Sequence, residues 1–156
     1  MDMQWYNTPL TVTLLMDEEH VVVGERETVT DGGGPRTVKQ IMTWNVNGLL
    51  DHIKRSALMR YLQGIGPAVA LLQETHLLGT KCSFLERRGY DNVFHAGFTR
   101  GSRGAAILLH RSLPFTVTDS KSEPGVRFVA VWGLMEGRKC KLVSVYAPPQ
   151  LQKTTL

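Results

Sequence analysis

The sequence has few cysteines and no long apolar segment, and both absences narrow what the chain can be. Cys82 and Cys140 stand far apart, without the paired spacing of a zinc site or a disulfide framework. No apolar stretch approaches the roughly 20 residues that a membrane-spanning helix needs, and the first residues lack the basic segment of a secretory signal. We therefore expect a soluble intracellular protein, nuclear or cytoplasmic, that does not contact a membrane.

Acidic and basic residues are unevenly distributed. Residues 1–37 carry seven acidic and two basic side chains, a net charge of −5, whereas residues 38–156 carry seven acidic and sixteen basic ones, a net charge of +9. A basic domain favours a partner rich in phosphate, such as DNA, although an ordinary solvated surface is the alternative. The breaker sequence at residues 31–35 leads us to expect an acidic, poorly structured leader over 1–37 and one domain over 38–156. Two short apolar runs in that leader, at 10–15 and 21–23, either pair as a hairpin or stay mobile.

The first half of the predicted domain has the pattern of a β-α-β unit. Residues 38–45 predict a strand, Asn47 and Gly48 a turn, and Asp51 the N-cap of a helix that is ended by Gly64, Gly66 and Pro67. Residues 68–72 form a continuous apolar run, which indicates a strand buried on both faces and parallel to the first. The expected apolar face of the helix consists of Ile53, Ala57, Leu58, Tyr61, Leu62 and Ile65.

Asn45 and Glu74 stand at the carboxyl ends of these two predicted strands. In such a unit both ends meet at one edge of the sheet, the edge where open α/β sheets bind ligands. An amide oxygen and a carboxylate are ligands that Mg²⁺ accepts, so the sequence predicts a magnesium site with Glu74 and Asn45 as ligands. Considered singly, Asn45 is also typical of a turn and Glu74 of a helix start.

The second half has the pattern of successive strands. The predicted strands cover residues 104–109, 115–118, 126–132 and 141–146, with turns between them. We expect an antiparallel meander whose last strand presents Tyr146 before two prolines end the ladder.

Four segments together resemble a known family. They are Trp44-Asn45-Val46-Asn47-Gly48-Leu49, Leu72-Gln73-Glu74-Thr75-His76-Leu77, Gly104-Ala105-Ala106-Ile107-Leu108 and Val143-Ser144-Val145-Tyr146-Ala147-Pro148. In order and spacing they resemble the endonuclease/exonuclease/phosphatase superfamily, and most of all the apurinic-type endonuclease domain of non-LTR retrotransposons such as long interspersed elements. The resemblance implies an α/β fold, the first half of a two-sheet α/β sandwich. It also implies a Mg-dependent endonuclease that hydrolyses phosphodiester bonds in DNA to nick a target site.

The resemblance implies three catalytic residues. Glu74 corresponds to the metal-binding glutamate, Asn45 to the amide at the metal and the scissile phosphate, and Tyr146 to the tyrosine that contacts this phosphate. Asn47 stands where relatives can place an aspartate near the metal. A tyrosine at a strand end is otherwise most often a packing residue.

Further residues are candidates for binding the nucleic acid. Asn47, Thr75 and His76 lie close in sequence to the catalytic candidates and can reach a nucleic-acid backbone, although an exposed loop is an equal explanation for His76. Arg100 and Arg103 are separated by small residues that let a phosphate strand approach, or they belong to a solvated loop.

The chain also departs from the family. The Gly-Asp-x-Asn and Ser-Asp-His motifs of the family's second half do not occur in it. We therefore expect a truncated domain that lacks the second sheet, exposes an apolar face, is marginally stable, and is nearly inactive without a C-terminal half of the same domain. The alternatives are a noncatalytic or degenerate nucleic-acid-binding protein that keeps the half-fold, and a phosphatase of the same superfamily.

Overall fold

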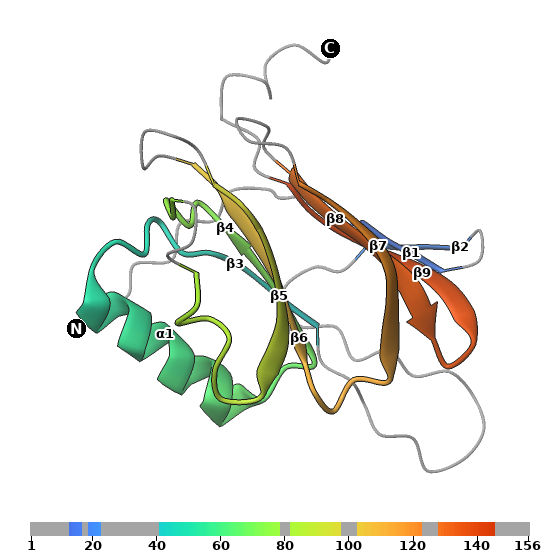
Figure 1. Ribbon diagram of the computed structural model, residues 1–156, viewed down its shortest axis with the longest axis horizontal. Helices are drawn as coiled ribbons and strands as arrows, with labels where there is room; N and C mark the ends of the chain where they lie inside the picture. The colour runs from blue at the N-terminus through green and yellow to red at the C-terminus, as the bar shows by residue number, and fades with distance from the viewer. Residues whose placement is uncertain are drawn as a thin grey trace.

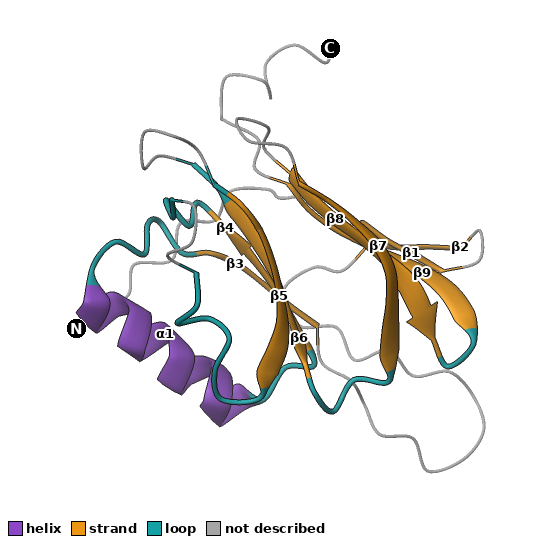
Figure 2. Cartoon of the chain, in the orientation of Figure 1, coloured by secondary structure: helices purple, strands orange, loops and turns teal. Residues whose placement is uncertain are grey.

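A computed structural model describes residues 13–16, 19–22, 41–78, 82–97, 103–122 and 128–145. These segments contain one helix and nine strands (Figure 2). In chain order they are β1 (Thr13–Met16), β2 (Glu19–Val22), β3 (Ile41–Asn45), α1 (His52–Ile65), β4 (Val69–Gln73), β5 (Tyr90–Ala96), β6 (Ala105–His110), β7 (Phe115–Ser122), β8 (Phe128–Met135) and β9 (Arg138–Val145).

The predicted β-α-β unit is confirmed. Strands β3 and β4 are parallel neighbours, with Asn45 opposite Gln73 at their carboxyl ends. Helix α1 begins at its predicted cap, because the Asp51 side chain accepts a hydrogen bond of 2.8 Å from the Ile53 backbone N–H. It ends at Gly66, which adopts the left-handed conformation that favours glycine.

The buried face of α1 differs from the predicted one. Leu58, Met59 and Leu62 are its buried residues, whereas Ile53 is 53% exposed and Ile65 is 37% exposed. The helix packs on the sheet through its middle, so apolar residues in its first and last turns remain in solvent. In the described part of the chain, no helix has the length and hydropathy required to cross a membrane.

The strands form two sheets, and the predicted meander is only partly right. One sheet has the order β3-β4-β6-β5 and the other β2-β1-β9-β8-β7. Strands β7, β8 and β9 do form a meander, and the turn between β8 and β9 has two residues with positive φ, Glu136 and Gly137, as tight hairpins require. Strand β6, however, pairs antiparallel with β4 in the first sheet.

The expectation of a missing second sheet is wrong. The two sheets face each other, and α1 covers the outer side of the first one (Figure 1). A core of buried side chains from both sheets, including Leu71, Ile107, Val131 and Leu142, lies between them. The predicted exposed apolar face is therefore covered by β8 and β9, and it gives no reason to expect marginal stability.

Three further strands, β1, β2 and β5, complete the two sheets. Of the alternatives for residues 1–30, the structure has the hairpin, since β1 pairs with β2 and also with β9. The domain boundary at residue 37 stays a prediction. Strand β5 was not predicted, because polar residues interrupt its pattern at the edge of the first sheet.

Candidate active site

The loops that follow β3 and β4 run side by side beyond the strand ends. Backbone N–H groups of Gly48 and Leu49 donate to the carbonyl oxygens of Glu74 and Thr75, at 2.6 Å and 2.9 Å. These bonds extend the pairing of the parallel strands past Asn45. Backbone hydrogen bonds alone therefore hold together the two loops that carry the polar residues of this edge.

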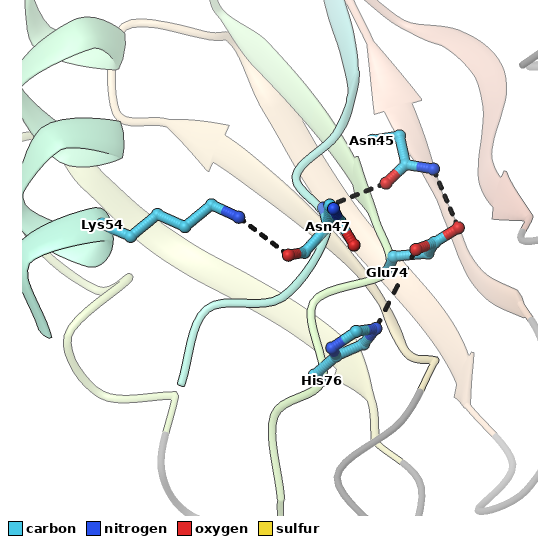
Figure 3. A network of polar contacts seen from close by, with 5 residues as sticks. All are labelled: Asn45, Asn47, Lys54, Glu74 and His76. Atoms are coloured by element: carbon cyan, nitrogen blue, oxygen red, sulfur yellow. Dashed lines mark hydrogen bonds and ion pairs between the residues drawn. The ribbon is translucent and has the colours of Figure 1, made fainter. Parts of the chain in front are cut away.

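Asn45 and Glu74 meet at this edge, as the sequence predicted (Figure 3). The Asn45 amide nitrogen, Nδ2, donates a hydrogen bond of 3.0 Å to Oε1 of Glu74. The amide oxygen, Oδ1, accepts a bond of 3.0 Å from the backbone N–H of Asn47. Because that N–H is a donor, it fixes the orientation of the amide, and the nitrogen must face the carboxylate.

An unusual backbone conformation brings the Glu74 carboxylate to Asn45. Side chains alternate along β4, so an extended residue after Gln73 would point toward α1. Glu74 instead has φ of 52°, in the left-handed region. Asn47, His76 and Arg103 have positive φ as well, with values of 47°, 55° and 66°. Non-glycine residues rarely adopt this conformation, and such strain gathers at functional sites.

One basic side chain lies beside Glu74, and a second reaches the loop after Asn45 (Figure 3). The His76 Nε2 atom lies 3.9 Å from Oε2 of Glu74, and both side chains are about three-quarters buried. Lys54 comes from α1 and donates a hydrogen bond of 2.7 Å to the Asn47 carbonyl. The Glu74 carboxylate therefore has an amide and an imidazole beside it, and an ammonium group binds the loop that follows Asn45.

The other predicted site residues are placed as follows. The Thr75 side chain is buried, with 1% exposure, so its position does not favour the predicted contact with a nucleic-acid backbone. The Asn47 side chain is exposed beside the site. Arg103 lies next to His76, whose backbone N–H donates to the Arg103 carbonyl at 2.6 Å. Tyr146 and Arg100 lie outside the described residues.

The oxygen ligands at this edge suit a hard divalent cation, although there are few of them. Within the described segments, no group of three or more His, Cys, Asp or Glu side chains is arranged to hold a metal ion. Glu74 offers a carboxylate that is 22% exposed, and Mg²⁺ is commonly held by one or two carboxylates while it keeps several waters. Asn45 turns its nitrogen toward Glu74, so this geometry suits it to orienting the carboxylate.

Two residues at this edge were not singled out from the sequence. Lys54 belongs to the predicted helix, and nothing in its spacing indicates that it reaches the Asn47 carbonyl. Gln73 is fully buried and bonded to side chains of two other strands. The sequence does mark Gln73, because this polar residue comes directly after the apolar run of 68–72 and extends the predicted strand.

Comparisons with solved structures find similarity to three structures of TDP2. Selenomethionine TDP2 from Caenorhabditis elegans is 16% identical, with a TM-score of 0.52 over 72% of this chain and 36% of that chain. Another C. elegans TDP2 structure is 17% identical, with a TM-score of 0.47, covering 64% of this chain and 32% of that one. A humanized D. rerio TDP2 carrying 14 mutations is 23% identical, with a TM-score of 0.49, covering 65% and 46%. The chain thus spans between about a third and a half of the length of these structures.

A family comparison covers most of the chain. Residues 42–153 match the model of the Endonuclease/Exonuclease/phosphatase family. The matched region includes both strand ends that carry Asn45 and Glu74, as well as the second sheet from β7 onward. On this match, the chain belongs to the Endonuclease/Exonuclease/phosphatase family.

Proposed function

We propose that this chain contributes the metal-binding edge of a magnesium-dependent endonuclease that hydrolyses phosphodiester bonds in DNA, of the kind that nicks target sites for non-LTR retrotransposons. The observation that carries the proposal is the Asn45–Glu74 hydrogen bond at the carboxyl ends of two neighbouring parallel strands, in a chain of this family. The net charge of +9 over residues 38–156 supports a polyanionic substrate. The retrotransposon subtype rests on the four sequence segments alone.

Each residue at the edge has a role in this proposal. Glu74 would hold the cation, and Asn45 keeps one carboxylate oxygen in place by donating from Nδ2. Bound Mg²⁺ supplies charge neutralisation at the phosphate and at the leaving oxygen. The His76 ring lies beside the second oxygen of the Glu74 carboxylate and limits how far this carboxylate can rotate. The proposed role of Tyr146, a hydrogen bond to a phosphate oxygen, stays a prediction.

Full activity also requires groups that the described residues do not supply. A phosphodiesterase needs a base to activate water, and Glu74, as the proposed metal ligand, is not free to act as that base. The matched structures are more than twice the length that this chain covers in them. We propose that a C-terminal half of the same domain provides the remaining catalytic groups.

The test is cleavage of supercoiled DNA by the 156-residue chain with and without Mg²⁺. We expect slow nicking that requires the metal, far below the rate of a complete family member. Glu74→Gln should abolish it, because the amide keeps the shape of the side chain and removes the negative charge. Glu86→Gln is the matched control, since Glu86 is an exposed carboxylate elsewhere on the domain.

Two outcomes would count against the proposal. Nicking that survives Glu74→Gln would mean that the site is elsewhere or that the activity is a contaminant. Binding of DNA without any metal-dependent nicking would favour a noncatalytic nucleic-acid-binding protein. The absence of a three-ligand cluster among the described residues is the observation that keeps this second candidate open.

A further inference from the structure

A buried polar network lies directly beneath the Asn45–Glu74 pair. Gln73 is fully buried, and its Nε2 atom lies 3.0 Å from Oγ1 of Thr43 and 3.3 Å from Oγ of Ser144. The Ser144 hydroxyl in turn donates to the Leu72 carbonyl at 3.2 Å. The network therefore joins β3, β4 and β9, and β9 belongs to the opposite sheet (Figure 1).

The three side chains occupy equivalent places on their strands. On β4, Gln73 follows Leu71 on the face between the sheets, and on β9 Ser144 follows Leu142 on the facing side. Each strand thus changes from apolar to polar at its carboxyl end. The catalytic candidates come immediately afterwards in the sequence, because Asn45 follows Thr43 by two positions and Glu74 follows Gln73 by one.

The orientation of the Gln73 amide is fixed by its surroundings. Nε2 lies 3.1 Å from the Leu71 carbonyl, so an oxygen at the same place would face another acceptor. Oε1 consequently points the other way, where it is buried and has no hydrogen-bond partner among the described residues. A buried amide with an unbonded oxygen costs free energy of folding. A leucine in place of Gln73, like the one at position 71, would pack here without this cost. Core packing therefore does not explain a glutamine at this position.

We infer that Gln73 is a positioning residue for the candidate site. It holds β3 and β9 against β4 just before the strand ends that carry Asn45 and Glu74, and so sets the distance between the Asn45 amide and the Glu74 carboxylate. This inference rests on the proposed function for what the site does. The effect of Gln73 on the placement of Asn45 can be tested without an activity assay.

The test uses the side-chain NH₂ signals of Asn45 in a ¹H–¹⁵N NMR spectrum of the full chain. They are assigned by their loss in Asn45→Asp. Gln73→Met keeps the length and apolar volume and removes both interstrand bonds. Leu71→Met is the control, because Leu71 lies on the same strand and face and is also buried. We expect the Asn45 NH₂ signals to move in Gln73→Met by more than in Leu71→Met.

A second variant keeps the test decisive if Gln73→Met does not fold. Ser144→Ala removes one hydroxyl, and with it the bond from Gln73 Nε2 and the bond to the Leu72 carbonyl, at a minimal change of volume; it should move the same signals in the same direction. Unchanged Asn45 signals in a folded Gln73→Met, or in Ser144→Ala where that is the variant that folds, would overturn the inference.

Binding of Mn²⁺ separates this inference from the proposed function. Paramagnetic broadening of the signals around Asn45 gives the affinity of the wild-type chain for the ion. We expect Gln73→Met to weaken that affinity by about 10-fold to 100-fold, as loss of a partner behind a metal ligand typically does. Equal affinity in the two folded chains would refute the positioning role. No Mn²⁺ broadening in wild type, with Asn45 signals that still respond to Gln73→Met, would refute the metal site and keep the geometric claim.

Discussion

Replacement of Gly48 by alanine tests the close packing of the candidate site. Gly48 has φ of +85°, and a Cβ atom there would lie 2.7 Å from Nδ1 of His76. The left-handed conformation costs an alanine about 1 to 2 kcal/mol. Overpacking against the imidazole adds about 1 to 3 kcal/mol. Gly48→Ala should therefore destabilise the fold by about 2 to 5 kcal/mol.

Gly137 provides a control with the same backbone cost. Its φ is +81°, and a Cβ atom there would meet nothing within 4 Å. In urea unfolding, Gly137→Ala should lose only about 1 to 2 kcal/mol, and the difference between the two variants measures the contact with His76. In a His76→Ala background, Gly48→Ala should fall to the level of the control. Equal losses for the two glycine variants in the wild-type background would refute the predicted contact.

Three further predictions concern the helix cap and the buried titratable groups. Asp51→Ala should destabilise the fold by about 1 kcal/mol and lower the helical signal in circular dichroism, since it removes the N-cap; no change would argue against the cap. Burial lowers the pKa of His95 more than Glu86 raises it, so stability should fall as the pH drops below 6.5, and His95→Gln should flatten that fall. Burial raises the pKa of the Cys82 and Cys140 thiols to about 11, so the stability they contribute should be complete below pH 9 and decline between 9 and 11. Replacing both cysteines with alanine should remove that decline, and an unchanged slope would contradict it.

The sequence was most informative where the local pattern decides the structure. Helix α1, its Asp51 cap and the parallel pairing of β3 with β4 follow from periodicity and turn residues, which act over a few positions. The meeting of Asn45 and Glu74 follows from that topology. Their direct hydrogen bond does not, because it depends on the positive φ of Glu74.

Sheet membership could not be predicted in the same way. Strands β6 and β7 have similar lengths and follow each other closely, yet β6 joins β4 and β7 joins β8. A strand's own sequence specifies which face is apolar and not which neighbour it pairs with. For the same reason Gln73 was overlooked, since its partner Ser144 lies 71 positions away.

The anomalous signal of crystals soaked in Mn²⁺ would show whether Glu74 holds a divalent ion. We expect a peak beside the Glu74 carboxylate, on the side that the Asn45 amide leaves open, and no such peak in Glu74→Gln crystals. A peak held by other carboxylates, with none at Glu74, would contradict this expectation.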